Sequence, residues 1–244
     1  MLSSTINDWV VLIPGETIAE IGLRQGETRR QNGFQEKDPT MVLNDRDQEI
    51  INVTWHGRGG QGGVTAAMIL AEAAYIDGYK GVTAAPFFGV ERRGAPITAT
   101  TRFSRTPIRT LTPTAKAEVV VVLDERLMQA VDILRSLKPD GLIILNSSSP
   151  PEKFCTDMDI AVATSDANSI AEEIGLVVAG TLLINTSLLG AFSRASGLVS
   201  MESLEKAISK NFSPKAAQLN IRGARLTYEA TRINRVWQLS SPGV

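Results

Sequence analysis

Residues 54–65 read TWHGRGGQGGVT, with five glycines in twelve positions. The preceding segment, EIINVTWHG, is rich in β-branched residues and ends at a glycine, which is typical of a strand. The next segment, GVTAAMILAEAAYIDG, has its apolar residues at the spacing of one helix face, namely Val64, Ala67, Met68, Ala71 and Ala74. The stretch therefore predicts a strand, a tight glycine turn and a helix.

Three of these glycines, Gly57, Gly59 and Gly62, fit the pattern G-x-G-x-x-G. They lie where phosphate binding by this pattern requires them, directly after a strand and at the start of a helix. The first glycine permits the turn, the second lets the backbone approach a phosphate, and the third lets the helix pack on the strand. The N-terminus of the helix then offers N–H groups and a partial positive charge to an anion. The pattern favours a phosphate site, and the alternative is a turn with a purely structural role.

The kind of phosphate ligand depends on the residues after the loop. An NAD site has an acidic residue about 20 positions further on, at the end of the second strand. Asp77 has this separation, but it lies in the Asp-Gly turn that ends the helix. The next strand instead runs into PFFGVERRGAP, where Arg92 and Arg93 suit a ligand with an additional phosphate, such as NADP or coenzyme A. The alternative is that both arginines bind carboxylates of a partner subunit.

The rest of the chain alternates between strand and helix patterns. Further strands are predicted at GVTAAP, ITATTRFS, AEVVVVLD, GLIILN and DMDIAVAT. Helices are predicted over 127–137, from a cap at Ser165 or Asp166 to Ile174, after the polar step Asn185-Thr186-Ser187, after a cap at Ser200, and over 215–237. The alternation predicts an α/β fold, a Rossmann-like three-layer domain whose mostly parallel sheet is covered on both faces.

Three regions are expected along the chain. Residues 1–48 carry no continuous helical or strand period, and we expect an N-terminal extension that contacts partner subunits as an arm. Its contact residues would be Trp9, Val10, Leu12 and Ile13, and the alternatives are a partly ordered tail or a lid. Residues 49–235 form the predicted α/β domain, and residues 236–244 form a C-terminal tail.

Composition excludes several classes of function. The 244 residues carry a formal net charge of −1 with a pI of about 6.0, so we expect neither a nucleic acid nor a membrane as partner. No segment approaches an 18-residue apolar span, and the cytoplasm is the expected location. Cys155 is the only cysteine, which excludes an internal disulfide, a thiolate zinc site or an iron-sulfur cluster held by this chain alone. We therefore predict no metal site.

The sequence contains no evident reaction centre. His56 is the only histidine, and no serine or cysteine stands in an arrangement with it that favours nucleophilic catalysis. Cys155 lies in the polar loop SSSPPEKFCTD without an activating neighbour. We therefore predict a binding site and no catalytic residue.

Four blocks of sequence identify a family. They are TWHGRGGQGGVTAAMILAEAA, PFFGVERRGAPITATTRFS, AEVVVVLDERLM and INTSLLGAFSRASGLVSMESLEKAI. Together, between about Glu49 and Tyr228, they resemble the gamma subunit of 2-oxoacid:ferredoxin oxidoreductases, the pyruvate:ferredoxin oxidoreductase group. The N-terminal extension is longer than the pyruvate-type subunit leads one to expect, which leaves the identity of the 2-oxoacid open.

The resemblance implies a subunit of a complex that decarboxylates a 2-oxoacid oxidatively to acyl-CoA and CO2. Thiamine diphosphate, Mg and 4Fe-4S clusters would lie on partners, namely alpha, beta and ferredoxin-like delta subunits, and ferredoxin or another acceptor would take the electrons. This chain would be inactive alone and would supply scaffold and coenzyme A contacts. The residues carried over from the family are Gly57, Arg58, Gly59, Gln61 and Gly62 toward the coenzyme A phosphates, with Arg92, Arg93, Asn185 and Thr186 for the rest of the site. For Asn185 the alternative is a helix cap.

Two other classes of function stay open at this point. One is a self-contained NADP-binding reductase, and the other is a purely structural interaction subunit with an empty glycine loop. Within the resembled family, pyruvate is the default substrate. The alternatives are 2-oxoglutarate, a branched-chain 2-oxoacid or an aromatic one such as phenylglyoxylate.

Overall fold

The computed structural model describes residues 10–11, 50–87, 94–108, 116–155, 158–178 and 180–239. Most of the predicted N-terminal arm lies outside these residues, as do Arg92, Arg93 and the end of the predicted tail. The described part of the arm is strand β1 (Val10–Val11), which joins the main sheet.

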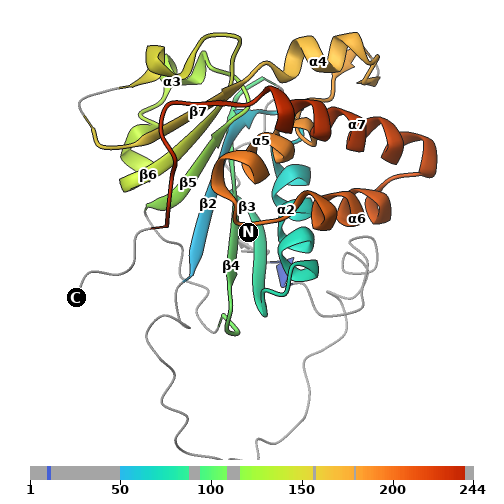
Figure 1. Cartoon of the computed structure of the whole chain (residues 1–244), viewed down its shortest axis with the longest axis horizontal. Helices are drawn as coiled ribbons and strands as arrows, with labels where there is room; N and C mark the ends of the chain where they lie inside the picture. Colours follow the sequence, from blue (N-terminus) through green and yellow to red (C-terminus); the bar gives the residue numbers. More distant parts are fainter. Residues whose placement is uncertain are drawn as a thin grey trace, which may run out of the picture.

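An eight-stranded sheet with the order β1-β3-β4-β2-β5-β6-β7-β10 runs through the domain (Figure 1). Its four parallel strands are neighbours: β2 (Ile51–Arg58), β5 (Ala117–Val122), β6 (Leu137–Asn146) and β7 (Ala161–Ser165). The flanking strands pair antiparallel: β1, β3 (Gly81–Phe87), β4 (Pro96–Ser104) and β10 (Arg232–Ile233). All six residues of β5 are buried, as its nearly continuous valine run predicts for a strand covered on both faces.

Helices cover the sheet from two sides. One face packs against α2 (Gly63–Ile76), α4 (Ala167–Glu173), α5 (Ser187–Ser196), α6 (Met201–Asn211) and α7 (Pro214–Ala230). The opposite face of β5, β6 and β7 packs against α3 (Leu127–Ala130) and the short 3-10 turns η2 (Leu134–Ser136) and η3 (Pro151–Phe154). A separate hairpin, β8 (Val177–Val178) and β9 (Thr181–Leu182), lies between α4 and α5 in the chain. The α/β fold with three layers is therefore confirmed.

Helices α5 and α7 approach each other unusually closely. A Cβ atom placed on Gly190 would lie 1.8 Å from the carbonyl oxygen of Ala224. On the sheet side of α5, the ring of Phe192 stacks on Trp55 with 6.5 Å between the ring centroids. The absence of a side chain at position 190 thus lets α7 rest on α5 while α5 rests on the sheet.

The predicted helix starts are confirmed by their hydrogen bonds. Asp166 caps α4, since its Oδ1 accepts from the N–H of Ser169 at 3.0 Å. Ser200 caps α6, since its Oγ accepts from the N–H of Ser203 at 3.2 Å. Both are the side-chain-to-backbone bonds that a helix N-terminus requires.

Two predicted helices are wrong in extent. The segment 127–137 is α-helical only to Ala130, because Leu137 already pairs with Ala117 as the first residue of β6. The helix predicted over 215–237 ends at Ala230, because the chain then turns to pair β10 with the edge of β7. Trp237, in the predicted tail, packs on the domain and donates from Nε1 to the carbonyl oxygen of Asp140 at 2.8 Å. Pairing with distant strands overrides the local helical pattern in both places.

Each helix within the described residues is too short or too polar to cross a bilayer.

Candidate functional site

The glycine loop, residues 57–63, lies at the point where the chain turns to opposite sides of the sheet. After β2 the chain enters α2 on one face and continues to β3 and β4. After β5, the parallel neighbour of β2, it passes through α3 and η2 on the other face to reach β6. Open α/β sheets bind their ligands outside the strand ends at such a switch point.

Close contacts explain two of the glycines. Gly62 precedes α2 with a φ of 76°, and a Cβ atom there would lie 2.5 Å from Nδ2 of Asn185. A Cβ atom on Gly57 would lie 2.6 Å from Cδ1 of Leu123, which comes directly after β5. The loop therefore fits closely between the end of β5 and the start of α5. The first N–H groups of α2 have no acceptor within the helix, which suits an anion at this end.

The side chain of Gln61 holds the loop rather than extending away from it. Its Oε1 accepts from the N–H of Arg58 at 2.7 Å, and its own backbone N–H donates to the carbonyl oxygen of Arg58 at 3.0 Å. The loop also pairs with the chain before β4, because Gly59 donates to Ala95 at 2.9 Å and Gly94 donates to Gly59 at 3.2 Å. These bonds fix the conformation of the loop.

Asn185 meets the loop from the start of α5. Its Nδ2 donates to the carbonyl oxygen of Gly62 at 3.2 Å, and the residue is 5% exposed. Thr186, the next predicted site residue, points elsewhere, because its buried hydroxyl donates to Oδ1 of Asn220 on α7 at 2.5 Å. The structure thus brings Asn185 to the loop and directs the Thr186 side chain into the helix layer.

Asp124, Arg58 and Arg126 form a cluster of ion pairs at the switch point. The sequence analysis named Arg58 as a site residue but did not name Asp124 or Arg126. Asp124, directly after β5, accepts from Nε of Arg58 and from Nε and Nη2 of Arg126, each at 2.8 Å. The hydrogen bonds from Arg126, together with those from Arg58, lower the pKa of Asp124 to about 2 against the opposing effect of burial. Asp124 and Arg126 could have been found from their position directly after the valine-rich strand, because the carboxyl ends of neighbouring parallel strands lie at one edge of the sheet.

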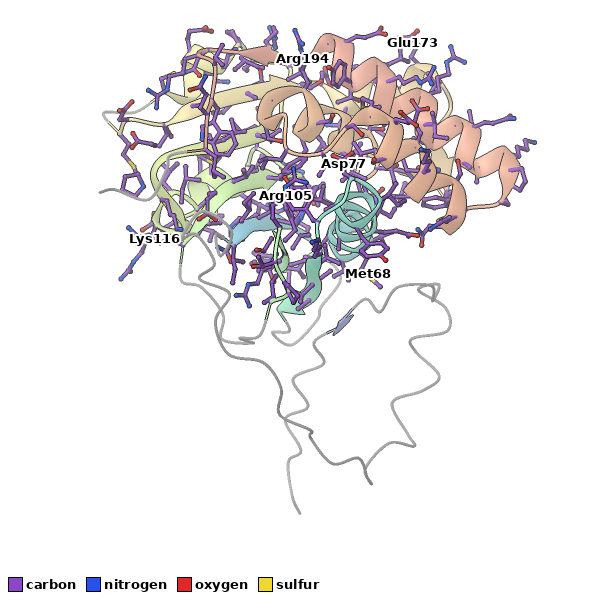
Figure 2. The ribbon with its side chains drawn as sticks, turned by 60° about the horizontal axis from the view of Figure 1, so that its bottom comes forward. Met68, Asp77, Arg105, Lys116, Glu173 and Arg194 are labelled. Carbon is purple, nitrogen blue, oxygen red and sulfur yellow. The ribbon has the colours of Figure 1, made fainter. Side chains whose placement is uncertain are left out.

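His56 and Asp77, which the sequence analysis did not assign to the site, make structural contacts. Burial lowers the pKa of His56 to about 4, and its Nε2 lies 3.3 Å from Oγ of Ser136. Asp77 holds the capping residue of α6 in place by accepting from Oγ of Ser200 and Oγ of Ser203, both at 2.7 Å. Because α2 has 14 residues, Asp77 lies roughly 20 Å from the glycine loop. In Figure 2, Asp77 and Arg105 lie near each other at the far end of α2. Desolvation raises the pKa of the Asp77 carboxyl group, but the hydrogen bonds from Ser203 and Ser200, with a smaller effect of the Arg105 charge, bring this pKa below its usual value.

A family model described as pyruvate ferredoxin/flavodoxin oxidoreductase matches residues 52–230, a span that includes the glycine loop, Asp124 and Asn185. The chain belongs to this family. The gamma subunit common to the pyruvate and ketoisovalerate oxidoreductases of Pyrococcus furiosus is 48% identical over 187 residues, covering 75% of this chain and 98% of that protein. Pyruvate synthase subunit PorC of Methanothermobacter thermautotrophicus is 46% identical, covering 77% and 99%.

A solved structure supports the same assignment. The crystal structure of pyruvate oxidoreductase subunit PORC from Thermotoga maritima is similar with a TM-score of 0.65 and 32% identity. The similarity covers 77% of this chain and 100% of that one. The predicted resemblance is confirmed, and the chain is a gamma-type subunit of an oxidoreductase.

Proposed function

We propose that this subunit holds coenzyme A within a multisubunit 2-oxoacid:acceptor oxidoreductase and serves as scaffold for its assembly. The observation that carries the proposal is the glycine loop at the switch point, held by its own hydrogen bonds directly before the N-terminus of α2, which favours an anion. The reaction of the complex is oxidative decarboxylation of a 2-oxoacid to acyl-CoA and CO2, in the cytoplasm. The partners are alpha, beta and delta subunits, with ferredoxin or another protein as electron acceptor.

The loop residues have different roles in this proposal. The backbone of 57–62 faces the coenzyme A phosphates, and the side chains of Gln61 and Asn185 keep that backbone in shape. Arg92 and Arg93 remain phosphate ligands in the proposal, supported by the bond from Gly94, the next residue, to Gly59. The hydroxyl of Thr186 is committed to Asn220, so a contact with coenzyme A would come from its backbone.

Catalysis by this subunit consists of positioning. Holding the coenzyme A thiol in one orientation converts a bimolecular encounter into an oriented step. Thiamine diphosphate and Mg, bound by partners, supply the decarboxylation chemistry. A 4Fe-4S cluster requires four thiolates, so with Cys155 as its only cysteine the chain leaves the clusters to other subunits. The subunit alone is expected to be inactive.

Pyruvate is the proposed substrate. Relatives named for pyruvate, or for pyruvate and ketoisovalerate together, support a small aliphatic 2-oxoacid. 2-Oxoglutarate and an aromatic oxoacid such as phenylglyoxylate are the alternatives. We further propose that residues 49–235 form the domain common to the family and that residues 1–48 contact partner subunits, since the family match begins only at residue 52.

The test is coenzyme A binding by the purified complex in the absence of a 2-oxoacid. Gly62→Ala strains a left-handed backbone and introduces a Cβ atom against Asn185, and we expect the Kd of coenzyme A to rise at least about tenfold. Gly197→Ala is the matched control, because Gly197 has a φ of 63° at the end of α5 with nothing within 4 Å of a Cβ atom. We expect this variant to bind coenzyme A like the wild type.

Two results would favour the rival functions. An unchanged Kd in the Gly62→Ala complex would mean that the loop is structural only. NADPH binding by the isolated chain, coupled to reduction of a carbonyl substrate, would identify a reductase. The chains that copurify with this subunit give an independent check, since a thiamine-binding chain and a cysteine-rich cluster chain are expected among them.

A further inference from the structure

We infer that Arg126 is a phosphate-binding residue of the coenzyme A site and that Asp124 holds it in position. This inference rests on the proposed function and extends it to the end of β5. Neither residue belongs to the glycine loop or to the Arg92-Arg93 pair.

The contacts of Asp124 fix two guanidinium groups side by side. Its Oδ1 accepts from Nε of Arg126 at 2.8 Å and from the backbone N–H of Arg126 at 3.1 Å. Its Oδ2 accepts from Nη2 of Arg126 and from Nε of Arg58, both at 2.8 Å. Both arginines therefore share one carboxylate oxygen, and Arg58 itself is part of the glycine loop.

Two carboxylates lie near the two guanidinium groups. Asp124, whose side chain is only 6% exposed, contacts both arginines. Glu125 accepts a hydrogen bond from Oγ of Ser147 at the end of β6 and acts on Arg126 through its charge without direct contact. The outer edge of the Arg126 guanidinium group therefore stays accessible to a phosphate group.

The two arginines differ in what they offer. Arg58 uses Nη1 to donate to the carbonyl oxygen of Gly94 at 3.2 Å, and its side chain is 31% exposed. The side chain of Arg126 is 77% exposed, and among the described residues its Nη1 has no acceptor. A guanidinium group held by a carboxylate on one edge loses little rotamer freedom when its other edge binds phosphate. Arg126 is thus a preorganised, accessible cation beside Arg58 of the glycine loop.

The experiment measures the Kd of coenzyme A for the purified complex carrying Arg126→Gln, by calorimetry without a 2-oxoacid. Loss of a charge-assisted hydrogen bond predicts an increase of about tenfold or more. Arg225→Gln is the matched control, because Arg225 makes the same two-bond contact with Glu205, at 2.5 and 2.8 Å, between α7 and α6. We expect the control to leave the Kd unchanged. The salt dependence of binding should also become weaker in Arg126→Gln only.

Two further arms complete the design. Arg126→Lys keeps the charge without the planar fork and should retain part of the affinity, which guards against a folding defect in Arg126→Gln. With 3′-dephospho-coenzyme A, a penalty that disappears assigns Arg126 to the 3′-phosphate, and one that persists assigns it to the pyrophosphate. Wild-type affinity in Arg126→Gln together with weakened binding in Gly62→Ala would overturn the role of Arg126 alone. Wild-type affinity in both would overturn the proposed function as well.

Discussion

Replacing Gly190 by alanine tests the contact between α5 and α7 on which the helix layer depends. The new Cβ atom would lie 1.8 Å from the carbonyl oxygen of Ala224 and 3.0 Å from the N–H nitrogen of Tyr228. Both neighbours are backbone atoms of α7, so no side-chain rotation relieves the contact. The two helices must move apart until the Cβ–oxygen distance reaches at least about 3.0 Å.

The expected cost can be worked out from these distances. Overpacking of a close-packed core costs about 1–3 kcal/mol, and two backbones in contact place this site at the upper end. Alanine regains up to about 1 kcal/mol of helix propensity over glycine. The free energy of unfolding should therefore fall by about 2 kcal/mol, which corresponds to a decrease in Tm of roughly 4–8 °C for a chain of this size.

Gly223→Ala on α7 is the comparison. Its Cβ atom would first meet Oγ of Ser187 at 2.6 Å and Cδ2 of Leu176 at 3.3 Å, which are side-chain atoms that can move. The gain in helix propensity is the same, so the difference in Tm between the two variants, measured by calorimetry, isolates the backbone contact. If Gly190→Ala melts at or above the temperature of the wild type, the backbones of α5 and α7 are not in direct contact.

Two further predictions concern titratable groups that the sequence analysis considered and did not assign to the site. Asp77→Ala removes the acceptor of the Ser200 and Ser203 hydroxyls and should lower the free energy of unfolding by about 1–2 kcal/mol. The affinity for coenzyme A should stay at the wild-type value, and weakened binding would contradict a purely structural role of Asp77. Burial lowers the pKa of His56 from 6.5 to about 4, so the unfolded chain binds a proton in this interval that the folded chain does not. The contribution of His56 to the free energy of unfolding should therefore fall as the pH drops from 6.5 toward 4. The proton NMR signals of this imidazole, the only one in the sequence, should stay constant from about pH 8 to about pH 5.5. A titration midpoint near 6.5 would show that the ring is exposed.

The parts of the site that depend on local sequence were predictable. The strand, turn and helix around Gly57 and Gly62 are encoded within a few residues, because backbone conformation, apolar spacing and free helix N–H groups are all local properties. The caps at Asp166 and Ser200 belong to the same class. They depend on a side chain and a backbone N–H three residues apart.

The contacts that link distant segments were not predictable in detail. Asn185 bonds to Gly62 across 123 positions, and Asp124 reaches Arg58 across 66, through the pairing of β5 with β2. The local sequence AEVVVVLDERLM does not determine which strands pair with it. The same reason explains the antiparallel flank, since the strand patterns of β3 and β4 do not fix their direction, which is set by their pairing with β2 and with each other.

Both edges of the main sheet end in strands of two residues, and these come from opposite ends of the chain. β1 pairs Val10 and Val11 with β3, and β10 pairs Arg232 and Ile233 with β7. Such short edge strands expose few unpaired N–H and C=O groups to a neighbouring molecule and so discourage aggregation by strand addition. Both strands lie outside the family-matched span of 52–230, so a fragment cut to that span would expose the longer strands β3 and β7 as new edges. We therefore expect β1 and β10 to lower the tendency of the described domain to pair with copies of itself through the edges of its sheet.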